Sequence, residues 1–433
     1  MNSLVEPVMS RTARSLGAME KFFFLLSKSH PNHFVMAGEV SGPTRVDQWQ
    51  DALDCVAHHS PLVWSRIERS RDGVPVFAPV PHGVVPLQVK PYGSSNWTDE
   101  AAAQVARPFD ELNPPLMRAT LLHGETRSII VLVAHHSIGD GLSLTALLGD
   151  LLRAMAGQPL KRSQQTMAVE RLIELTHGVP SADASAPAPA PAPASADAPD
   201  APVRAPLAMR EPDGSPAHAE ALRLTSAMTQ KLRERARDER TSVQSALVAA
   251  FTKAVCALTS DAPRQPMRVL SPVDLRRRLL GGSDHLAMCA SGVVHPDDHS
   301  RDARLWSRAR LAAQAFAGIE SPERLAAQVL GAHAMLDTVN GVADAKAVFA
   351  QAFGNDAVIT NLGVVDLPTR FGALALDAVW GPSVAVGVVG EQVIGAVTYR
   401  DRLHLVHTSY APMQGLLDQM VLEIAAALSD VSE

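Results

Sequence analysis

The first part of the chain alternates between two apolar periods, one typical of strands and one typical of helices. Residues 128–134 form a nearly continuous apolar run rich in β-branched side chains, which predicts a strand buried on both faces. Directly after it, leucines recur every three or four positions, and Gly157 follows. This spacing predicts an amphipathic helix from Leu142 that ends at the glycine. The same pattern predicts strands over residues 34–40 and 62–67, and a helix over residues 47–58 with Asp47 as its cap.

The second half of the chain shows a similar mixture. Residues 225–238 predict an amphipathic helix, and another helix is predicted from Thr241, whose hydroxyl would form a capping box with Gln244. Strands are predicted over residues 267–270, 358–361, 373–380, 384–389, 392–399 and 403–409, with a hairpin turn at 400–402, and a final helix over 413–428. Strands and helices therefore mix in both halves, which indicates an α/β or α+β fold.

A stretch rich in alanine and proline separates the two halves. Proline lacks an amide hydrogen and fixes φ, so residues 180–206 cannot form a helix and favour an extended conformation. At 433 residues the chain is too long for one ordinary core and fits two domains of about 200 residues. The sequence predicts an N-terminal domain over residues 1–178, a linker over 179–210 and a C-terminal domain over 211–433.

Composition narrows the classes of partner. Hydrophobic residues make up 46% of the chain and charged residues 19%, which is typical of a globular protein. The net charge of -6 leaves no basic surplus to neutralise phosphates, so nucleic acid is excluded as a partner. The strongest early apolar run, residues 22–26, is too short for a signal peptide or a membrane span, which predicts a cytoplasmic protein.

Several other histidines and the cysteines have structural interpretations. His58 and His59 stand at the end of a predicted helix, where they suit the negative end of its dipole. Residues 295–299 are predicted to form a solvated turn rather than a ligand cluster. Three cysteines, Cys55, Cys256 and Cys289, share no short metal-type spacing and are predicted to be small core residues. The sequence predicts no metal site.

The candidate chemistry lies in the heptapeptide His-His-Ser-Ile-Gly-Asp-Gly at residues 135–141, between the predicted buried strand and the leucine-rich helix. Two rigid elements would hold this short turn in place. The pKa of imidazole lies near neutrality, so a histidine there can take a proton from an attacking hydroxyl or amine and return it to a leaving thiolate. Only one of the adjacent pair, His135 and His136, can face a substrate.

Asp140 has three possible roles on the sequence alone. It is suited to cap the helix that begins near Gly141, because its carboxylate can accept the first amide hydrogens. It can also form a buried ion pair that shapes the histidine loop, with Arg276 as the candidate partner. A third possibility is that it orients the catalytic histidine, as a triad aspartate does. Gly139 and Gly141 are expected to form a tight turn that needs unusual backbone angles or a close approach of the substrate.

The heptapeptide resembles the HHxxxDG motif of the superfamily of chloramphenicol acetyltransferase (CAT), condensation domains of nonribosomal peptide synthetases and polyketide-associated acyltransferases. Four further segments are similar, in order and spacing, to the phthiocerol/phthiodiolone dimycocerosyl transferase type. They are Arg-Ser-Leu-Gly-Ala-Met-Glu at residues 14–20, His-Ser-Pro-Leu at 59–62, Ser-Pro-Val-Asp-Leu-Arg at 271–276 and Thr-Asn-Leu-Gly at 360–363. The likeness covers most of the chain apart from the linker.

This resemblance implies two CAT-like subdomains arranged in a V around a central tunnel. His136 inherits the role of general base, with His135, Asp140, Gly141 and Arg276 in supporting positions. The resemblance also brings three residues, Asn361, Trp380 and Ser383, to the tunnel or to an oxyanion site, with Trp380–Ser383 in a segment that crosses between lobes. Peptide-forming domains typically carry Asp-Phe-Gly-Trp-Gly there, whereas this chain has Ala-Val-Trp-Gly at 378–381, which favours free-standing ester or amide formation.

The implied activity is acyl transfer from a thioester to a hydroxyl or amine, in polyketide, nonribosomal peptide or lipid natural-product biosynthesis. The donor would be acyl-CoA or a phosphopantetheinyl acyl carrier protein that is a separate chain, and no bound cofactor is expected. Three alternatives stay open: a free-standing condensation domain that forms an amide or ester for chain release, a non-catalytic protein that docks a carrier protein, and a hydrolase of the same thioesters.

Overall fold

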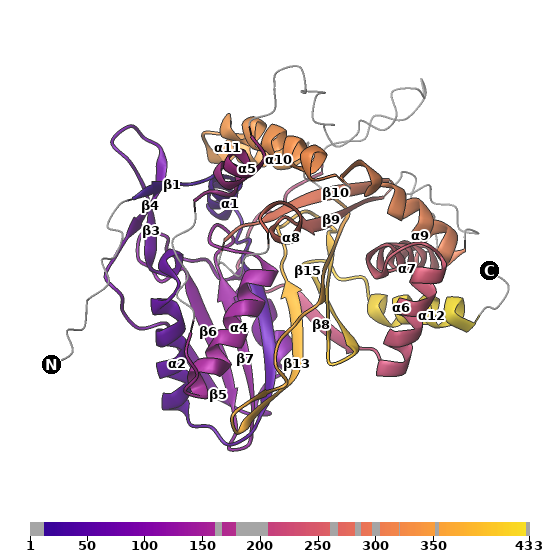
Figure 1. Ribbon diagram of the computed structural model, residues 1–433, viewed down its shortest axis with the longest axis horizontal. Helices are drawn as coiled ribbons and strands as arrows, with labels where there is room; N and C mark the ends of the chain where they lie inside the picture. Colours follow the sequence, from indigo (N-terminus) through magenta and orange to yellow (C-terminus); the bar gives the residue numbers. More distant parts are fainter. Residues whose placement is uncertain are drawn as a thin grey trace.

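The computed structural model describes residues 13–160, 167–178, 207–259, 267–281, 287–296, 304–319, 321–350 and 355–429. The predicted linker lies outside the described residues as far as residue 206. Within the described ranges, helices and strands alternate in both halves of the chain, and most strands belong to two large sheets (Figure 1). The mixed α/β architecture predicted from the sequence is confirmed.

The first large sheet has the order β12-β13-β2-β7-β6-β5. Its strands are β2 (Phe34–Ser41), β5 (Leu87–Pro91), β6 (Met117–His123), β7 (Arg127–Ala134), β12 (Arg370–Phe371) and β13 (Leu374–Ser383). Side chains of β7 alternate between the two faces, as expected of a strand buried on both sides. Ile130 and Leu132 belong to the same core as α2 (Val46–His58) and α4 (Gly141–Met155), whereas Val131 and Val133 pack with α3 (Trp97–Ala106).

The second large sheet has the order β10-β9-β11-β14-β15-β8. Its strands are β8 (His218–Arg223), β9 (Arg268–Asp274), β10 (Ala290–Pro296), β11 (Ala357–Val364), β14 (Gln392–Tyr399) and β15 (Arg402–Ser409). Four helices contribute to the core on this sheet: α6 (Ser226–Asp238), α7 (Val243–Leu258), α9 (Leu305–Gln314) and α12 (Leu416–Ser429). Arg400 and Asp401 have φ of 49° and 58°, which forms the hairpin turn predicted between β14 and β15.

The two halves of the sequence interleave in space. Strands β12 and β13 come from the second half but pair into the first sheet, where β13 lies antiparallel to β2 (Figure 1). Helices α10 (Pro322–Asp337) and α11 (Val342–Val348) likewise lie beside α1 (Ala18–Ser27), and α10 also contacts α5 (Val169–His177). The segment that contains Trp380–Ser383 is therefore a strand of the first sheet.

The remaining elements are short. A three-stranded sheet has the order β1-β4-β3 and consists of β1 (Arg14–Ser15), β3 (Ser65–Arg69) and β4 (Pro75–Pro79). The α-helix α8 spans Arg276–Leu279, and 3₁₀ turns span Pro61–Trp64 and Ala317–Ile319. Among the described residues no single helix is long and apolar enough to cross a membrane; α6 and α7 meet that test only as a pair bent by 103°.

Four local predictions are wrong. Residues 62–67 begin in a 3₁₀ turn and only then enter β3, since Pro61 starts a helical turn. Asp47 is not the cap of α2, because the helix begins one residue earlier. Ser242, not Thr241, caps α7; the Thr241 hydroxyl instead donates to the carbonyl of Ala309. Residues 384–389 are not a strand, and only Val388 forms an isolated bridge.

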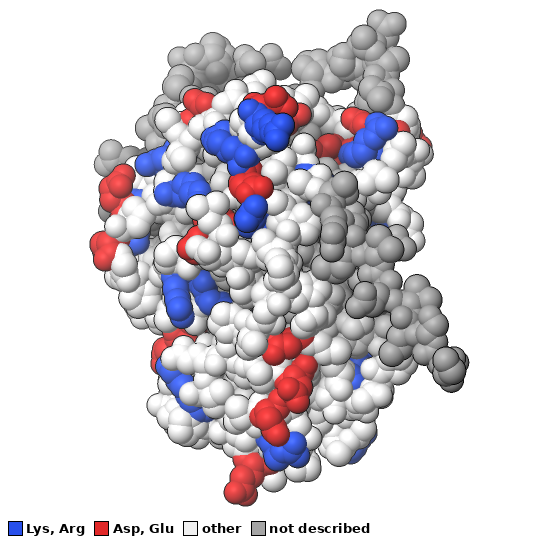
Figure 2. Space-filling view, turned by 90° about the vertical axis from the view of Figure 1, so that its left-hand side faces the viewer, with Lys and Arg blue, Asp and Glu red and all other residues white. Residues whose placement is uncertain are grey.

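The three cysteines differ in their exposure to solvent. Cys55 is exposed and Cys256 partly so, which leaves Cys289 alone as the buried residue that was predicted for all three. Cys55 lies on the solvent side of amphipathic α2, between the buried residues Leu53 and Val56. Figure 2 shows Lys and Arg interspersed with Asp and Glu rather than one continuous field of a single sign.

Candidate active site

The heptapeptide forms the turn between β7 and α4, as the sequence predicted. β7 ends at Ala134 and α4 begins at Gly141, so the intervening residues are held by a buried strand and a buried helix. The backbone N–H of His135 donates to Leu116 O at 3.0 Å, and that of Ile138 donates to His135 O at 3.0 Å. These bonds fix the turn close to the neighbouring strand β6.

His136 lies half-buried with one ring nitrogen engaged and the other available. Its Nδ1 lies 3.0 Å from the carbonyl oxygen of Gly139, which can only accept, so Nδ1 carries the proton and Nε2 keeps its lone pair. The ring stacks on Phe23 of α1, with centroids 4.1 Å apart and planes 11° apart, and lies 5.0 Å from the ring of Phe34. Burial lowers the pKa of His136, although the Gly139 carbonyl and the Asp140 carboxylate oppose the shift, so the ring is neutral at pH 7.

His135 has different neighbours from His136, and its proton lies on the other ring nitrogen. Its ring is fully buried, and its Nδ1 accepts a hydrogen bond of 3.1 Å from the backbone N–H of Ser137. The proton therefore resides on Nε2, which lies 3.6 Å from Oε1 of Glu111. Burial lowers the pKa of His135 despite the opposing effect of that carboxylate. His135 is therefore neutral and held by a hydrogen bond within the turn.

Asp140 caps α4 and pairs with Arg276 at the same time. Its Oδ1 accepts from the backbone N–H and the hydroxyl of Ser143, both at 3.0 Å. Its Oδ2 lies 2.8 Å from the guanidinium of Arg276 and accepts from the backbone N–H of Cys289 at 3.0 Å. Burial disfavours the charged carboxylate, but Arg276 and these hydrogen bonds outweigh it and lower the pKa of Asp140. Arg276 also contacts Asp274 at 3.1 Å, so the pair joins the motif turn to the end of β9.

Gly141 marks the place where the second half of the chain approaches the motif. A Cβ atom at this position would lie 3.0 Å from Leu362 Cδ2 and 3.2 Å from Pro382 Cγ. Neither Gly139 nor Gly141 has a positive φ, so the expectation of unusual backbone angles is wrong. The groups that approach Gly141 closely are side chains of the chain itself. The neighbour of Leu362, Asn361, is half-buried, and its Oδ1 accepts from the backbone N–H of Gly363 at 2.9 Å.

Trp380 and Ser383 are engaged in contacts of their own. The indole N–H of Trp380 donates to Glu39 at 2.7 Å, and its ring packs against Trp97 and His404 with centroids 5.5 and 4.7 Å away. This places Trp380 in the core on the α3 face of the first sheet. The buried Ser383 hydroxyl lies 2.6 Å from that of Thr408 in β15, so it links the two large sheets.

Comparisons with known proteins agree on the fold. The model described as phthiocerol/phthiodiolone dimycocerosyl transferase C-terminus matches residues 213–282. The first condensation domain of the calcium-dependent antibiotic synthetase, with a bound substrate analogue, superposes with a TM-score of 0.69 at 16% identity over 98% of both chains. The chain has the condensation-domain fold. The resemblance inferred from the motif segments is thereby confirmed.

Two further solved structures share this fold, and one curated sequence matches a short segment. Polyketide synthase associated protein 5 from Mycobacterium tuberculosis has a TM-score of 0.66 at 16% identity, over 97% of this chain and 98% of that one. Trichothecene 15-O-acetyltransferase TRI3 from Fusarium sporotrichioides has a TM-score of 0.64 at 13% identity, over 96% and 95%. Nonribosomal peptide synthetase NPS2 of Ceriporiopsis subvermispora (strain B) is 37% identical over 70 residues, which span 16% of this chain and 3% of that protein.

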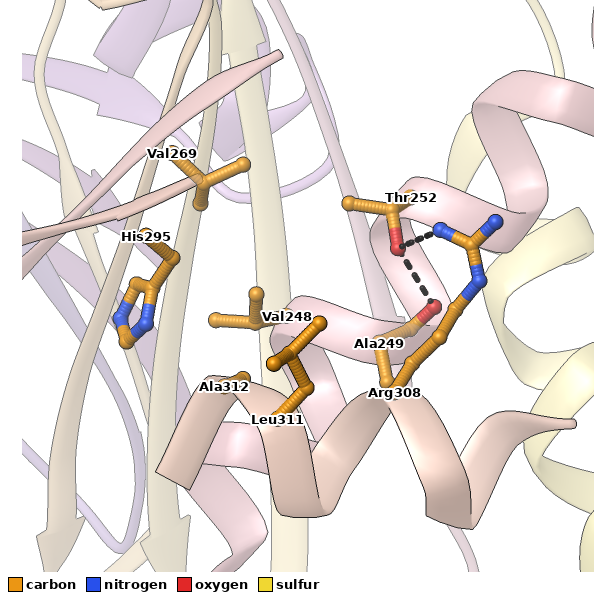
Figure 3. Close-up of a pocket in the computed structure, with 8 residues that line it drawn as sticks. All are labelled: Val248, Ala249, Thr252, Val269, His295, Arg308, Leu311 and Ala312. Carbon is orange, nitrogen blue, oxygen red and sulfur yellow. Dashed lines mark hydrogen bonds between the residues drawn. The ribbon is translucent and has the colours of Figure 1, made fainter. Parts of the chain in front are cut away.

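Two other histidines that the sequence singled out, His58 and His295, have their ring contacts outside the motif, whereas the ring of His33 lies 5.4 Å from that of His135. His58 ends α2 as predicted. The prediction of a solvated turn at residues 295–299 is wrong for His295, which is buried in β10 with Nε2 3.0 Å from the hydroxyl of Ser271; residues 297–299 lie outside the described residues. Figure 3 shows His295 beside a cavity of about 10 Å³ between β9, β10, α7 and α9, which is too small for a substrate. In the described part of the chain, no group of three or more His, Cys, Asp or Glu residues is arranged to hold a metal ion.

Sequence reasoning missed three residues that hold the motif. Phe23 stacks on His136, and Glu111 lies beside His135. Ser143 receives a hydrogen bond from Arg276 at 2.8 Å while it donates to Asp140. The apolar run at 22–26 could have indicated that Phe23 packs in the interior. The place of Ser143 as the third residue of α4 could have indicated that it bonds the capping residue. Glu111 had no sequence signal, because only the fold brings it to the motif.

Proposed function

We propose that this chain is an acyltransferase that moves an acyl group from a thioester to a hydroxyl or amine, with His136 as the general base. The observation that carries the proposal is the proton arrangement of His136. Its Nδ1 is tied to the Gly139 carbonyl, which directs the lone pair of Nε2 outward from the turn. Positioned neutral imidazole of this kind is suited to general base catalysis near neutral pH.

In the proposed reaction, Nε2 of His136 removes the proton from the acceptor O–H or N–H as that atom attacks the thioester carbonyl. A tetrahedral oxyanion forms and collapses, the C–S bond breaks, and the departing thiolate takes the proton from the imidazolium. The Gly139 carbonyl keeps the ring oriented throughout, and the Phe23 ring restricts its rotation. Asp140 acts through the shape of the turn, because both of its carboxylate oxygens are occupied by Ser143, Arg276 and Cys289.

The oxyanion needs a hydrogen-bond donor, and Asn361 is the strongest of the three proposed side chains. Its carbonyl oxygen is fixed by Gly363, which leaves the Nδ2 amide as a donor, and the next residue, Leu362, touches the Gly141 position. The Ser383 hydroxyl is bonded to Thr408, and the Trp380 indole is bonded to Glu39. Backbone amides near the motif remain part of this proposal.

The proposed donor is acyl-CoA or an acyl carrier protein, both of which carry the acyl group as a phosphopantetheine thioester. The proposed site lies between two CAT-like subdomains. Related folds include a trichothecene 15-O-acetyltransferase and condensation domains of synthetases, which supports a role in polyketide or nonribosomal peptide biosynthesis. We retain the proposed subdomain boundaries at residues 178 and 211. The short crossover at 378–381 supports free-standing ester or amide formation.

The test is intact-mass spectrometry of the protein with acyl-CoA and acyl-carrier donors, each combined with a panel of alcohols and amines. Turnover should fall about 10²–10⁴-fold in His136→Ala, the usual scale for loss of a general base. His59→Ala is the matched control, since this histidine lies at the end of α2, away from the motif. Equal turnover in wild type and His136→Ala would refute the proposal. Thioester loss without acceptor would indicate a hydrolase, and carrier binding without any transfer would indicate a docking protein.

A further inference from the structure

Glu111 places a buried carboxylate beside the histidine turn. It lies in the turn between α3 and β6, and its side chain is 8% exposed. Its Oε1 accepts a hydrogen bond from the hydroxyl of Ser27 at 2.9 Å, and its Oε2 lies 2.6 Å from Nζ of Lys28. Both partners lie at the end of α1. The same Oε1 is 3.6 Å from Nε2 of His135.

This carboxylate is charged. Burial alone would raise the pKa of Glu111, but His135 and Lys28 outweigh burial and lower the pKa to about 2. The charged groups around His135 are Glu111, Lys28 and Arg118, and the nearby imidazole of His33 is neutral because burial lowers its pKa well below the usual value. Glu111 is therefore the anion that acts most strongly on His135.

A charged carboxylate at this position selects one tautomer of His135. With the proton on Nε2, the ring directs its N–H toward the carboxylate and its Nδ1 lone pair toward the Ser137 amide. The other tautomer would direct a lone pair toward the carboxylate and an N–H toward the Ser137 N–H. Both contacts would then be repulsive. The separation of 3.6 Å exceeds a hydrogen bond, so the effect is electrostatic.

The tautomer of His135 decides whether the backbone N–H of Ser137, the residue after His136, has an acceptor. Ser137 is held at two points: its N–H donates to His135 Nδ1, and its hydroxyl donates to the backbone oxygen of Glu20 at 2.8 Å. His136 lies between His135 and Ser137, so its backbone is fixed on both sides. Loss of the first bond would leave a buried amide hydrogen without an acceptor, which is unfavourable.

We propose that Glu111 is a positioning residue that keeps the proton of His135 on Nε2 and thereby holds the Ser137 amide and the orientation of His136. The inference deepens the proposed function. Its kinetic consequences rest on that function, whereas the tautomer of His135 does not. The partner of one ring nitrogen of a histidine, often a carboxylate, commonly decides which of the two nitrogens carries the proton.

The chain offers a closely matched control. Glu100 also has an 8% exposed side chain, lies 2.5 Å from a lysine (Lys90) and accepts from a serine hydroxyl (Ser95) at 2.9 Å. Unlike Glu111, it lies on α3, and its partners belong to β5 and to the turn just before α3. Glu111→Gln and Glu100→Gln therefore remove the same charge from the same kind of ion pair, and differ in their relation to His135.

The decisive measurement is the tautomer of His135, read from long-range ¹⁵N–¹H correlations of protein labelled with ¹⁵N-histidine and assigned with a His135→Asn variant. Wild type and Glu100→Gln should show the Nε2–H form. Glu111→Gln should show a substantial Nδ1–H population or exchange between the two forms. An unchanged Nε2–H signal in folded Glu111→Gln would overturn the inference. If Glu111→Gln does not fold, Lys28→Met tests the same site, because it leaves the carboxylate in place and should retain the Nε2–H form.

Kinetics give a second readout. The kcat of Glu111→Gln should fall about 10–100-fold, the usual cost of losing such a partner, with little change in KM for the donor. Glu100→Gln should match wild type in both kcat and KM. If kcat fell by the same factor in Glu111→Gln and Glu100→Gln, the proposal would be contradicted. Because the tautomer is measured without substrate, failure of the proposed acyl transfer would leave this test intact.

Discussion

At the residue scale, two adjacent histidines of identical chemistry carry their protons on different ring nitrogens because their neighbours differ. The carbonyl of Gly139 holds the proton of His136 on Nδ1, while the amide of Ser137 requires the lone pair of His135 at the same atom. His135 is fully buried, and His136 is half-buried. The choice of His136 as the base, made from a resemblance, therefore acquires a physical argument, although the role itself stays a proposal.

Asp140→Asn should destabilise the protein by about 3 kcal/mol, the low end for breaking a buried ion pair, because Asn can still cap α4 and Asp274 still contacts Arg276. The pKa of Asp140 is lowered in the folded state, so its contribution is present above pH 4 and is lost as the pH falls through the folded pKa. Urea unfolding between pH 2.5 and 7 measures the difference.

The control for this prediction is Asp47→Asn, which removes an exposed carboxylate paired with Arg45. It should leave the unfolding midpoint unchanged. If Asp140→Asn lost no more stability at pH 7 than this control, the pair with Arg276 would not contribute to stability.

At the scale of elements, one carboxylate satisfies two of the roles that the sequence left open. Asp140 uses Oδ1 for the cap of α4 and Oδ2 for Arg276, so helix capping and ion pairing were never exclusive. The third role, direct orientation of His136, has no hydrogen bond to support it, since Gly139 holds the ring. The start of α4 is thus the point where strand, helix and the second half of the chain are joined.

Gly141→Ala tests how tightly β11 and β13 approach this helix start. The new methyl group would press on Leu362 and Pro382, which should cost about 1–3 kcal/mol of stability, typical of overpacking, even though Ala favours helices over Gly. Truncation of Leu362 in the double variant Gly141→Ala/Leu362→Ala should make the combined loss smaller than the sum of the single losses by about 1 kcal/mol. Chemical denaturation of the four proteins measures this, and strict additivity would show that the contact is not tight.

At the scale of the whole molecule, the crossover of β13 joins the two large sheets. Gly395 in β14 lies so close to the crossover that a Cβ atom there would clash with the carbonyl oxygen of Pro382. The Ser383 and Thr408 hydroxyls bond across the same junction. Backbone rather than flexible side chain faces Gly395, so the approach of the two sheets depends on the absence of a side chain at this position.

Gly395→Ala should therefore separate the sheets and lower stability by more than the control Gly292→Ala. In the control, the new methyl group meets Cδ1 of Leu270 at 2.7 Å, the end of a side chain that can rotate away. We expect a loss above about 3 kcal/mol for Gly395→Ala, beyond the usual range for overpacking, and about 1 kcal/mol for Gly292→Ala. Thermal unfolding of both variants provides the measurement, and equal losses would contradict this account of the junction.

The sequence by itself determined the elements with a strong period and the position of the turn that carries the candidate chemistry. The apolar run before the motif and the leucine repeat after it are local signals, and both became the predicted strand and helix. Predictions that depended on the exact first residue of a helix were wrong at Asp47 and Thr241, since neighbouring polar residues compete for the cap. The exposed Cys55 and buried His295 were also misjudged, because burial depends on which face meets a partner.

Only the tertiary structure decided which distant residues surround the motif. Phe23 belongs to α1, Glu111 to the turn before β6, and Leu362 to β11. No local period in the sequence relates these residues to His136. The pairing of β13 with β2, which brings a strand of the second half into the first sheet, was likewise decided by the fold. Hydrogen bonds between strands and packing between layers act across any separation in sequence, whereas periodicity records only which side of an element is apolar.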